Sequence, residues 1–133
     1  MLMNFKGVII EESLINPDIL KEVKILKTKT ERVTVKHKTP WLQQWTLHTV
    51  EVPNNAADSI AKEISKFLDY SHKSAWYADY KNDRTHYIIF KGKVFKINRN
   101  SPQEYKAATD YGISLGIPDY QVDFSPFIKR WKR

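Results

Sequence analysis

The chain contains no cysteine among its 133 residues. This absence excludes disulfide bonds, thiolate metal sites and cysteine nucleophiles together. Glycine is also scarce, and the four glycines, at positions 7, 92, 112 and 116, form neither a phosphate-binding loop nor a dinucleotide-binding fingerprint. No run of about 18 apolar residues occurs, so we expect no contact with a membrane through a spanning helix.

The N-terminal segment MLMNFKGVII lacks the basic region, apolar core and small-residue cleavage site of a signal peptide. Its β-branched residues predict instead a first strand that begins near Phe5. A chain of this length suits one domain, 1–133, with a core large enough to be stable without covalent links. Together with the absence of cysteine, these features favour a cytoplasmic location.

Positive charge is concentrated in two segments. The net charge is +7, from 22 basic and 15 acidic residues, and the excess lies in residues 21–38 and at the C-terminus, where 128–133 forms a basic and frayed tail. Such segments favour an anionic partner, but lysines on a strand also protect a sheet edge from aggregation. The candidate anion-binding residues are Lys27, Lys29, Arg32, Lys129 and Arg130.

Hydrophobic periodicity predicts an α+β fold. Apolar residues at helical spacing predict one helix over 56–68, and the capping box Ser101-Pro102-Gln103-Glu104 predicts the start of a second. Gly112, inside that second helix, indicates a close approach of another part of the chain. Short β-rich segments joined by tight turns predict a mostly antiparallel sheet of about five to six strands, with a bulge within 23–37 and both helices packed on one face.

The segment Ala75–Arg99 predicts three strands joined by two hairpin turns. A two-residue loop at Lys91-Gly92 places Phe90 opposite Lys93 and His86 opposite Ile97. Any loop with an even number of residues near Asn82-Asp83 places Asp79 on the same face as His86. A two-residue loop at Asn82-Asp83 makes these two residues direct cross-strand neighbours, about 5 Å apart at Cβ.

Asp79 and His86 are the candidate catalytic residues, because a carboxylate that holds an imidazole nitrogen is a component of general acid–base sites. The alternative is a hydrogen-bonded histidine at the margin of the core, since no nucleophile is placed beside the pair. The four histidines show no paired ligand spacing. The sequence therefore predicts no metal and no cofactor.

Aromatic residues form a second candidate site. Trp41 and Trp45, four positions apart, suit a stacking platform, and Tyr77, Tyr80 and Tyr87 fall on predicted strands with lysines nearby. Exposed aromatics on a basic sheet are typical of single-stranded nucleic-acid binding. The same residues also suit a dimer interface or simple burial as core anchors.

The blocks TPWLQQWTLHTVEV, WYADYKND, HYIIFKGKVFKI and YGISLGIPDYQVDFSP resemble a family of small uncharacterised prokaryotic proteins. The resemblance covers nearly the whole chain and implies a single domain of prokaryotic, cytoplasmic origin, but no activity and no site residue.

The hypothesis that follows from the residues is a non-enzymatic binding domain that uses an aromatic, basic sheet surface for a protein or small ligand. The alternatives are single-stranded nucleic-acid binding, a small acid–base enzyme that uses Asp79 and His86, and a homodimer.

Overall fold

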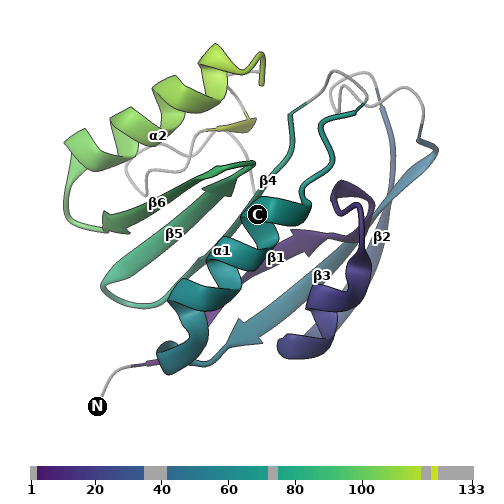
Figure 1. Ribbon diagram of the computed structural model, residues 1–133, viewed down its shortest axis with the longest axis horizontal. Coiled ribbons are helices and arrows are strands. Elements are labelled where there is room, and N and C mark those ends of the chain that lie inside the picture. The colour runs from purple at the N-terminus through teal and green to yellow at the C-terminus, as the bar shows by residue number, and fades with distance from the viewer. Residues whose placement is uncertain (1–2, 35–41, 72–74, 118–120, 123–133) are drawn as a thin grey trace.

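The computed structural model describes residues 3–34, 42–71, 75–117 and 121–122. In this part of the chain, six strands form one antiparallel sheet in the order β2-β3-β1-β4-β5-β6 (Figure 1). The strands are β1 (Phe5–Ile10), β2 (Lys24–Arg32), β3 (Gln44–Val52), β4 (Tyr77–Lys81), β5 (Thr85–Phe90) and β6 (Lys93–Asn98). The predicted α+β class and antiparallel sheet are confirmed, and β2 and β6 are its two edges.

Two α-helices and three short 3-10 turns complete the described fold: α1 (Ala57–Phe67), α2 (Pro102–Ser114), η1 (Glu11–Ser13), η2 (Pro17–Glu22) and η4 (Asn54–Ala56). At the start of α2, the Ser101 hydroxyl accepts a hydrogen bond from the Glu104 amide at 3.2 Å. The reciprocal bond of the capping box is absent, because the Glu104 carboxylate accepts from the Asn98 amide instead. Glu104 therefore connects the first turn of α2 to the end of β6.

The two helices cover opposite faces of the sheet, so the prediction that they share one face is wrong. Ile60 and Ile64 of α1 lie in one core cluster with Tyr87 and Ile89. A second cluster contains Tyr105 and Ala108 of α2 together with Ile88 and Phe90 of β5, which alternate with Tyr87 and Ile89 along the strand. Successive residues of a strand point to opposite faces, and β5 is buried from His86 to Phe90. A strand that is buried on both sides of a sheet needs a covering element on each side, and here these elements are the two helices. We call the two sides of the sheet the α1 face and the α2 face.

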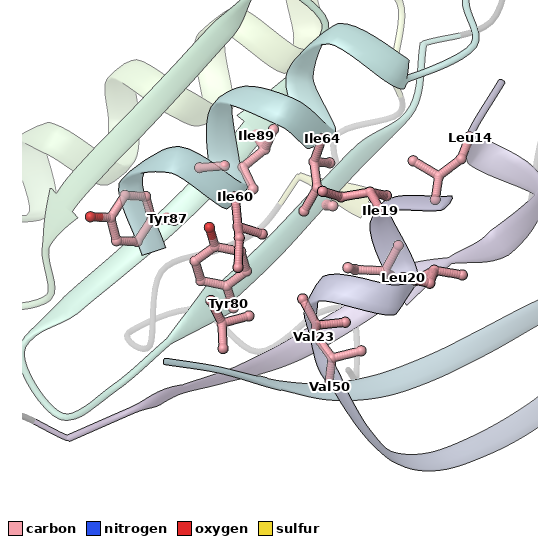
Figure 2. Packing of buried hydrophobic residues seen from close by; sticks show 14 of the residues in the cluster. Leu14, Ile19, Leu20, Val23, Val50, Ile60, Ile64, Tyr80, Tyr87 and Ile89 are labelled. Carbon is pink, nitrogen blue, oxygen red and sulfur yellow. The ribbon is translucent and has the colours of Figure 1, made fainter. Parts of the chain in front are cut away.

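The larger core lies on the α1 face. Figure 2 shows Ile60 and Ile64 of α1 beside Tyr80, Tyr87 and Ile89 of the sheet. Residues from η2 and its flanks extend this cluster: Leu14, Ile19, Leu20 and Val23. The short η2 turn begins where the Asn16 side chain accepts a hydrogen bond from the Asp18 amide, with Pro17 at its first position, as the sequence predicts. This turn therefore covers the part of the sheet that α1 does not reach.

Two glycines permit close packing that a side chain would block. A Cβ on Gly112 would lie 2.6 Å from Val122 Cγ1, which explains the glycine inside α2 and confirms the predicted close approach. A Cβ on Gly7 would lie 1.9 Å from the carbonyl oxygen of Asp79. Gly7 pairs with Tyr80, so it is the residue that allows β1 and β4 to come together.

The edge strand β2 is the most exposed element of the sheet. Eight of its nine residues are exposed, namely Lys24–Thr30 and Arg32. The ninth, Glu31, is half-exposed. Its register with β3 shifts between Ile25 and Lys27, which confirms the predicted bulge. Among the described residues, no helix is long and apolar enough to cross a membrane.

Candidate functional site

The turn between β4 and β5 decides how Asp79 and His86 meet. The Asn82 amide donates to the Thr85 carbonyl at 3.0 Å, which leaves Asp83 and Arg84 as the two turn residues. The turn thus lies one residue later than the Asn82-Asp83 loop considered above. Asp79 is opposite Ile88, and His86 is opposite Lys81. The two residues share a face, as any even loop requires, but they are diagonal rather than direct neighbours.

The diagonal placement still brings the two side chains into contact. His86 Nε2 lies 2.6 Å from Asp79 Oδ2, and His86 Nδ1 lies 3.0 Å from the Tyr105 hydroxyl of α2. His86 is 1 % exposed, Tyr105 1 % and Asp79 7 %. Both imidazole nitrogens therefore have a partner, which is the condition for burying a histidine without a penalty for unpaired polar atoms.

This arrangement connects α2 to the centre of the sheet. A general base must come within hydrogen-bond reach of a substrate, and both nitrogens of His86 face protein groups that are themselves buried. A hollow of about 430 Å³ lies at the start of α2, and neither Asp79 nor His86 lines it. The residues that line this hollow are Arg84, Thr85, Lys96, Ile97, Asn98, Asn100 and Glu104.

Three of the candidate stacking residues lie in the core. Trp45, Tyr80 and Tyr87 are buried, and the Trp45 ring lies 5.2 Å from that of Trp76. The Tyr77 side chain is half-buried and donates to the Gln121 carbonyl at 2.6 Å. A ring must expose a face to stack on a ligand, so the buried rings of Trp45, Tyr80 and Tyr87 are not available for stacking in this structure. Trp41, Lys129 and Arg130 lie outside the described residues.

Two buried tyrosines of the α1 face, Tyr80 and Tyr87, have raised pKa values. Burial raises the pKa of Tyr80 well above its ordinary value, and its hydroxyl donates to the Ala57 carbonyl. Burial and a hydrogen bond to Asp58 likewise raise the pKa of Tyr87. The same hydrogen bond lowers the pKa of Asp58, assisted by the nearby charge of Lys96. Both tyrosines therefore favour their neutral form in the folded protein.

The sheet register gathers lysines on the α2 face, at the end of the sheet away from α2. Lys27 is opposite Thr49, Thr49 is opposite Val8, and Val8 is opposite Asp79. Since cross-strand partners share a face, this row points to the same side as Asp79. Alternation along the strands adds the other members of what we call the lysine face, which consists of Lys6, Lys24, Lys27 and Lys29. The same registers place Glu31, Glu51 and Lys81 on this side. Arg32 points to the opposite side.

These four lysines differ from lysines elsewhere in the fold. Lys96 lies 3.6 Å from Asp58 and Lys106 lies 2.7 Å from Asp110. Lys21 and Lys66 are paired in the same way with Asp18 and Glu63. Within the described ranges, no ion pair joins any lysine of the lysine face to a carboxylate within 4.0 Å. Glu51 lies between Lys24 and Lys6 in the register, but its carboxylate accepts from the Asn4 side chain.

A second histidine network was not foreseen from the sequence. His48 Nδ1 lies 2.9 Å from the Thr28 hydroxyl, and His48 Nε2 lies 2.8 Å from Glu11 Oε1. The neighbouring Glu12 carboxylate accepts from the Thr46 amide at 2.6 Å. The one available signal was alternation, which places His48 on the buried side of β3 with Val50 and Val52. This network fastens the edge strand β2 to the body of the sheet.

Comparison of the chain with protein-family models, with curated proteins and with solved structures found no match. The resemblance to small prokaryotic proteins therefore stays a prediction. In the described part of the chain, no group of three or more His, Asp or Glu side chains could hold a metal ion. Among the described residues, we take the lysine face as the candidate functional site.

Proposed function

We propose that this chain is a non-enzymatic binding domain that recognises an acidic segment of a partner protein through its lysine face. The observation that supports the proposal most directly is the difference in pairing between lysines. One lysine on each of η2, α1, β6 and α2 lies within 4.0 Å of a carboxylate, whereas Lys27 and Lys29 have Thr49 and Leu47 across the sheet. Four positive charges on one side of a sheet attract an anionic partner and raise its association rate.

Two further observations favour a protein over other anions. Three of the candidate stacking rings, Trp45, Tyr80 and Tyr87, are buried, which leaves the lysines of the described face to contact mainly the phosphates of a nucleic acid. Ile25 and Leu26, next to Lys24 and Lys27, are 43 % and 42 % exposed. A protein partner can cover these apolar side chains, whereas a sugar–phosphate backbone gains little from them. The described hollow that would suit a small ligand lies elsewhere, at the start of α2.

The test compares two triple variants that remove the same charge. The first is Lys24→Gln, Lys27→Gln and Lys29→Gln on the lysine face. The control is Lys21→Gln, Lys66→Gln and Lys106→Gln, which are paired lysines on other elements. The probe is a fluorescently labelled nine-residue peptide of alternating Glu and Val, and binding is measured by anisotropy. We expect the first variant to bind about tenfold more weakly, since each exposed pair contributes roughly 0.5 kcal/mol.

The control variant should bind the peptide nearly as well as the unmodified protein. An equal loss in both variants would show that the peptide responds to net charge only, and would contradict a defined face. A single-stranded oligothymidylate of equal charge serves as the second probe at the same salt concentration. If the protein bound this oligonucleotide more tightly than the peptide, nucleic acid rather than protein would be the partner class.

A further inference from the structure

In the described part of the chain, no strand pairs with the outer side of β2. The strand β2 pairs with β3 and is the last strand of the sheet in the described chain. Nine residues at about 3.3 Å each give an edge of roughly 30 Å. An edge strand presents a row of backbone N–H and C=O groups on its outer side, and these groups can pair with another extended segment. The lysine face therefore continues directly into a second set of binding groups.

The other edge of the sheet is less available. The strand β6 has six residues, and both helices pack against it. Lys96 of this strand pairs with Asp58, and Lys93 Nζ lies 5.2 Å from the centre of the Phe95 ring. The charged groups of β6 are thus engaged within the chain, whereas Lys27 and Lys29 on β2 point outward without a carboxylate among the described residues. This contrast favours β2 as the site of pairing.

The charge of β2 decides what can pair with it. Like charges directly opposite each other destabilise a strand pair, and a second copy of this chain paired about Thr28, the middle of β2, would place Lys27 opposite Lys29. A segment with carboxylates at alternate positions would instead place them opposite Lys27 and Lys29, which share one face. Near the bulge, the exposed Ile25 and Leu26 would contact apolar side chains of the same segment. The complementary partner is therefore extended, acidic at alternate residues and apolar at one end.

The edge is also held in place before any partner arrives. The Thr28 hydroxyl lies 2.9 Å from His48 Nδ1, and Glu11 holds the other nitrogen of that ring. This network connects the middle of β2 to β3 and to η1. A strand that is already ordered loses less conformational entropy on binding, so preorganisation favours addition at this edge.

We infer that the partner segment adds to β2 as a further strand of the sheet, with its carboxylates opposite Lys27 and Lys29. The inference rests on the proposed function and deepens it, because recognition then uses backbone hydrogen bonds as well as charge. Strand addition of this kind takes its affinity from main-chain bonds and its specificity from alternate side chains.

The experiment separates backbone pairing from charge. The alternating Glu and Val peptide is prepared in two N-methylated forms, one methylated on the odd residues and one on the even residues. In a strand pair, alternate N–H groups point to the neighbouring strand, so only one of the two forms loses its pairing groups. The N-terminal residue is left unmethylated in both forms, so they keep the same charge and carry the same number of methyl groups. We expect one form to bind at least about thirtyfold more weakly than the other, since three to four hydrogen bonds are lost.

If the two methylated forms bound equally, strand addition would be wrong, although the charge-based recognition could still hold in the lysine variants. Both proposals are supported if one methylated peptide binds and the other does not, and if the triple lysine variant also loses affinity for the peptide. If the free protein were a dimer by light scattering that the peptide dissociates, a second copy would be the natural occupant of β2, and the inference would be overturned.

A protein-side variant tests the apolar contact. Leu26→Ser removes the exposed side chain at the bulge, and Ile113→Ser on α2 is the matched control, since Ile113 is 45 % exposed. We expect Leu26→Ser to weaken binding of the unmethylated peptide about threefold or more, and Ile113→Ser to leave it unchanged. Equal behaviour of the two variants would exclude the apolar contact at the bulge.

Discussion

At the scale of single residues, the buried tyrosines of the α1 face make stability depend on alkaline pH. Above about pH 10, tyrosines of the unfolded chain lose their protons, whereas Tyr80 and Tyr87 keep theirs in the folded protein because their pKa values are raised. The unfolded state then binds fewer protons than the folded state. The free energy of unfolding must therefore fall as pH rises above about 10, and it is unaffected by these groups below that pH.

The variant Tyr87→Phe tests this dependence. It removes one titrating group, so the decline of unfolding free energy above about pH 10 should be shallower than in the unmodified protein, by up to about 1.4 kcal/mol per pH unit. Urea unfolding from about pH 8 to pH 12 measures both slopes, and lysine titration is common to the two proteins. Identical slopes would show that Tyr87 ionises as easily when folded as when unfolded.

The contact between Asp79 and His86 could be predicted only in part from the sequence. Alternation alone places them on one face once the loop is even, and their side chains do meet at 2.6 Å. The turn position, one residue later than considered, changes a direct pair into a diagonal one. Tyr105 could not be foreseen as the third member, because the packing of α2 against β5 brings together residues 19 positions apart. Packing of α2 also encloses this candidate acid–base pair among protein groups.

At the scale of elements, the pairing of β1 with β4 depends on Gly7. A methyl group there would lie 1.9 Å from the Asp79 carbonyl oxygen and 2.5 Å from Tyr80 Cα. Backbone atoms cannot move aside as a flexible side chain can. We expect Gly7→Ala to lower the free energy of unfolding by about 3 kcal/mol or more, measured by urea denaturation.

Gly92→Ala is the control for this variant. Gly92 has a φ of 73° and no neighbour within 4 Å, so its substitution costs only the strain of a left-handed conformation. That cost is about 1–2 kcal/mol. If Gly7→Ala were no more harmful than Gly92→Ala, the close approach of β1 and β4 would not be what requires the glycine.

The helices show which element-level predictions depend on local signals. Apolar spacing predicts α1 almost to its ends, and the sequence Ser101-Pro102-Gln103-Glu104 predicts the start of α2. The side of the sheet that each helix covers was predicted wrongly. The continuous apolar run from Tyr87 to Phe90 indicates burial on both faces, and this signal favours helices on opposite sides.

At the scale of the whole molecule, stability should decrease from the centre of the sheet to the β2 edge. The central strands β1, β4 and β5 pair on both sides, and β5 is buried between two helices. In contrast, β2 pairs with β3 and is exposed on its faces. We expect backbone amides of β5 to exchange with solvent at least about a hundredfold more slowly than those of β2, by hydrogen exchange and mass spectrometry.

Exchange measured with the acidic peptide bound extends this prediction. Strand addition should slow exchange in β2 and leave β6 unchanged, because only the first edge gains hydrogen bonds. Comparable protection of β2 and β5 in the free protein would contradict the gradient, and would indicate that the β2 edge is already covered.

The sequence by itself determined the local elements, the two-residue hairpin at Lys91-Gly92 and the concentration of lysines in residues 21–38, because these depend on spacing between neighbours. Only the tertiary structure decided that β1 lies between β3 and β4, that β2 is an edge, and that four lysines share one face. It also decided that the aromatic residues Trp45, Tyr80 and Tyr87 are buried. The physical reason is that strand order arises from contacts between distant segments, whereas periodicity specifies only which residues of one strand share a side.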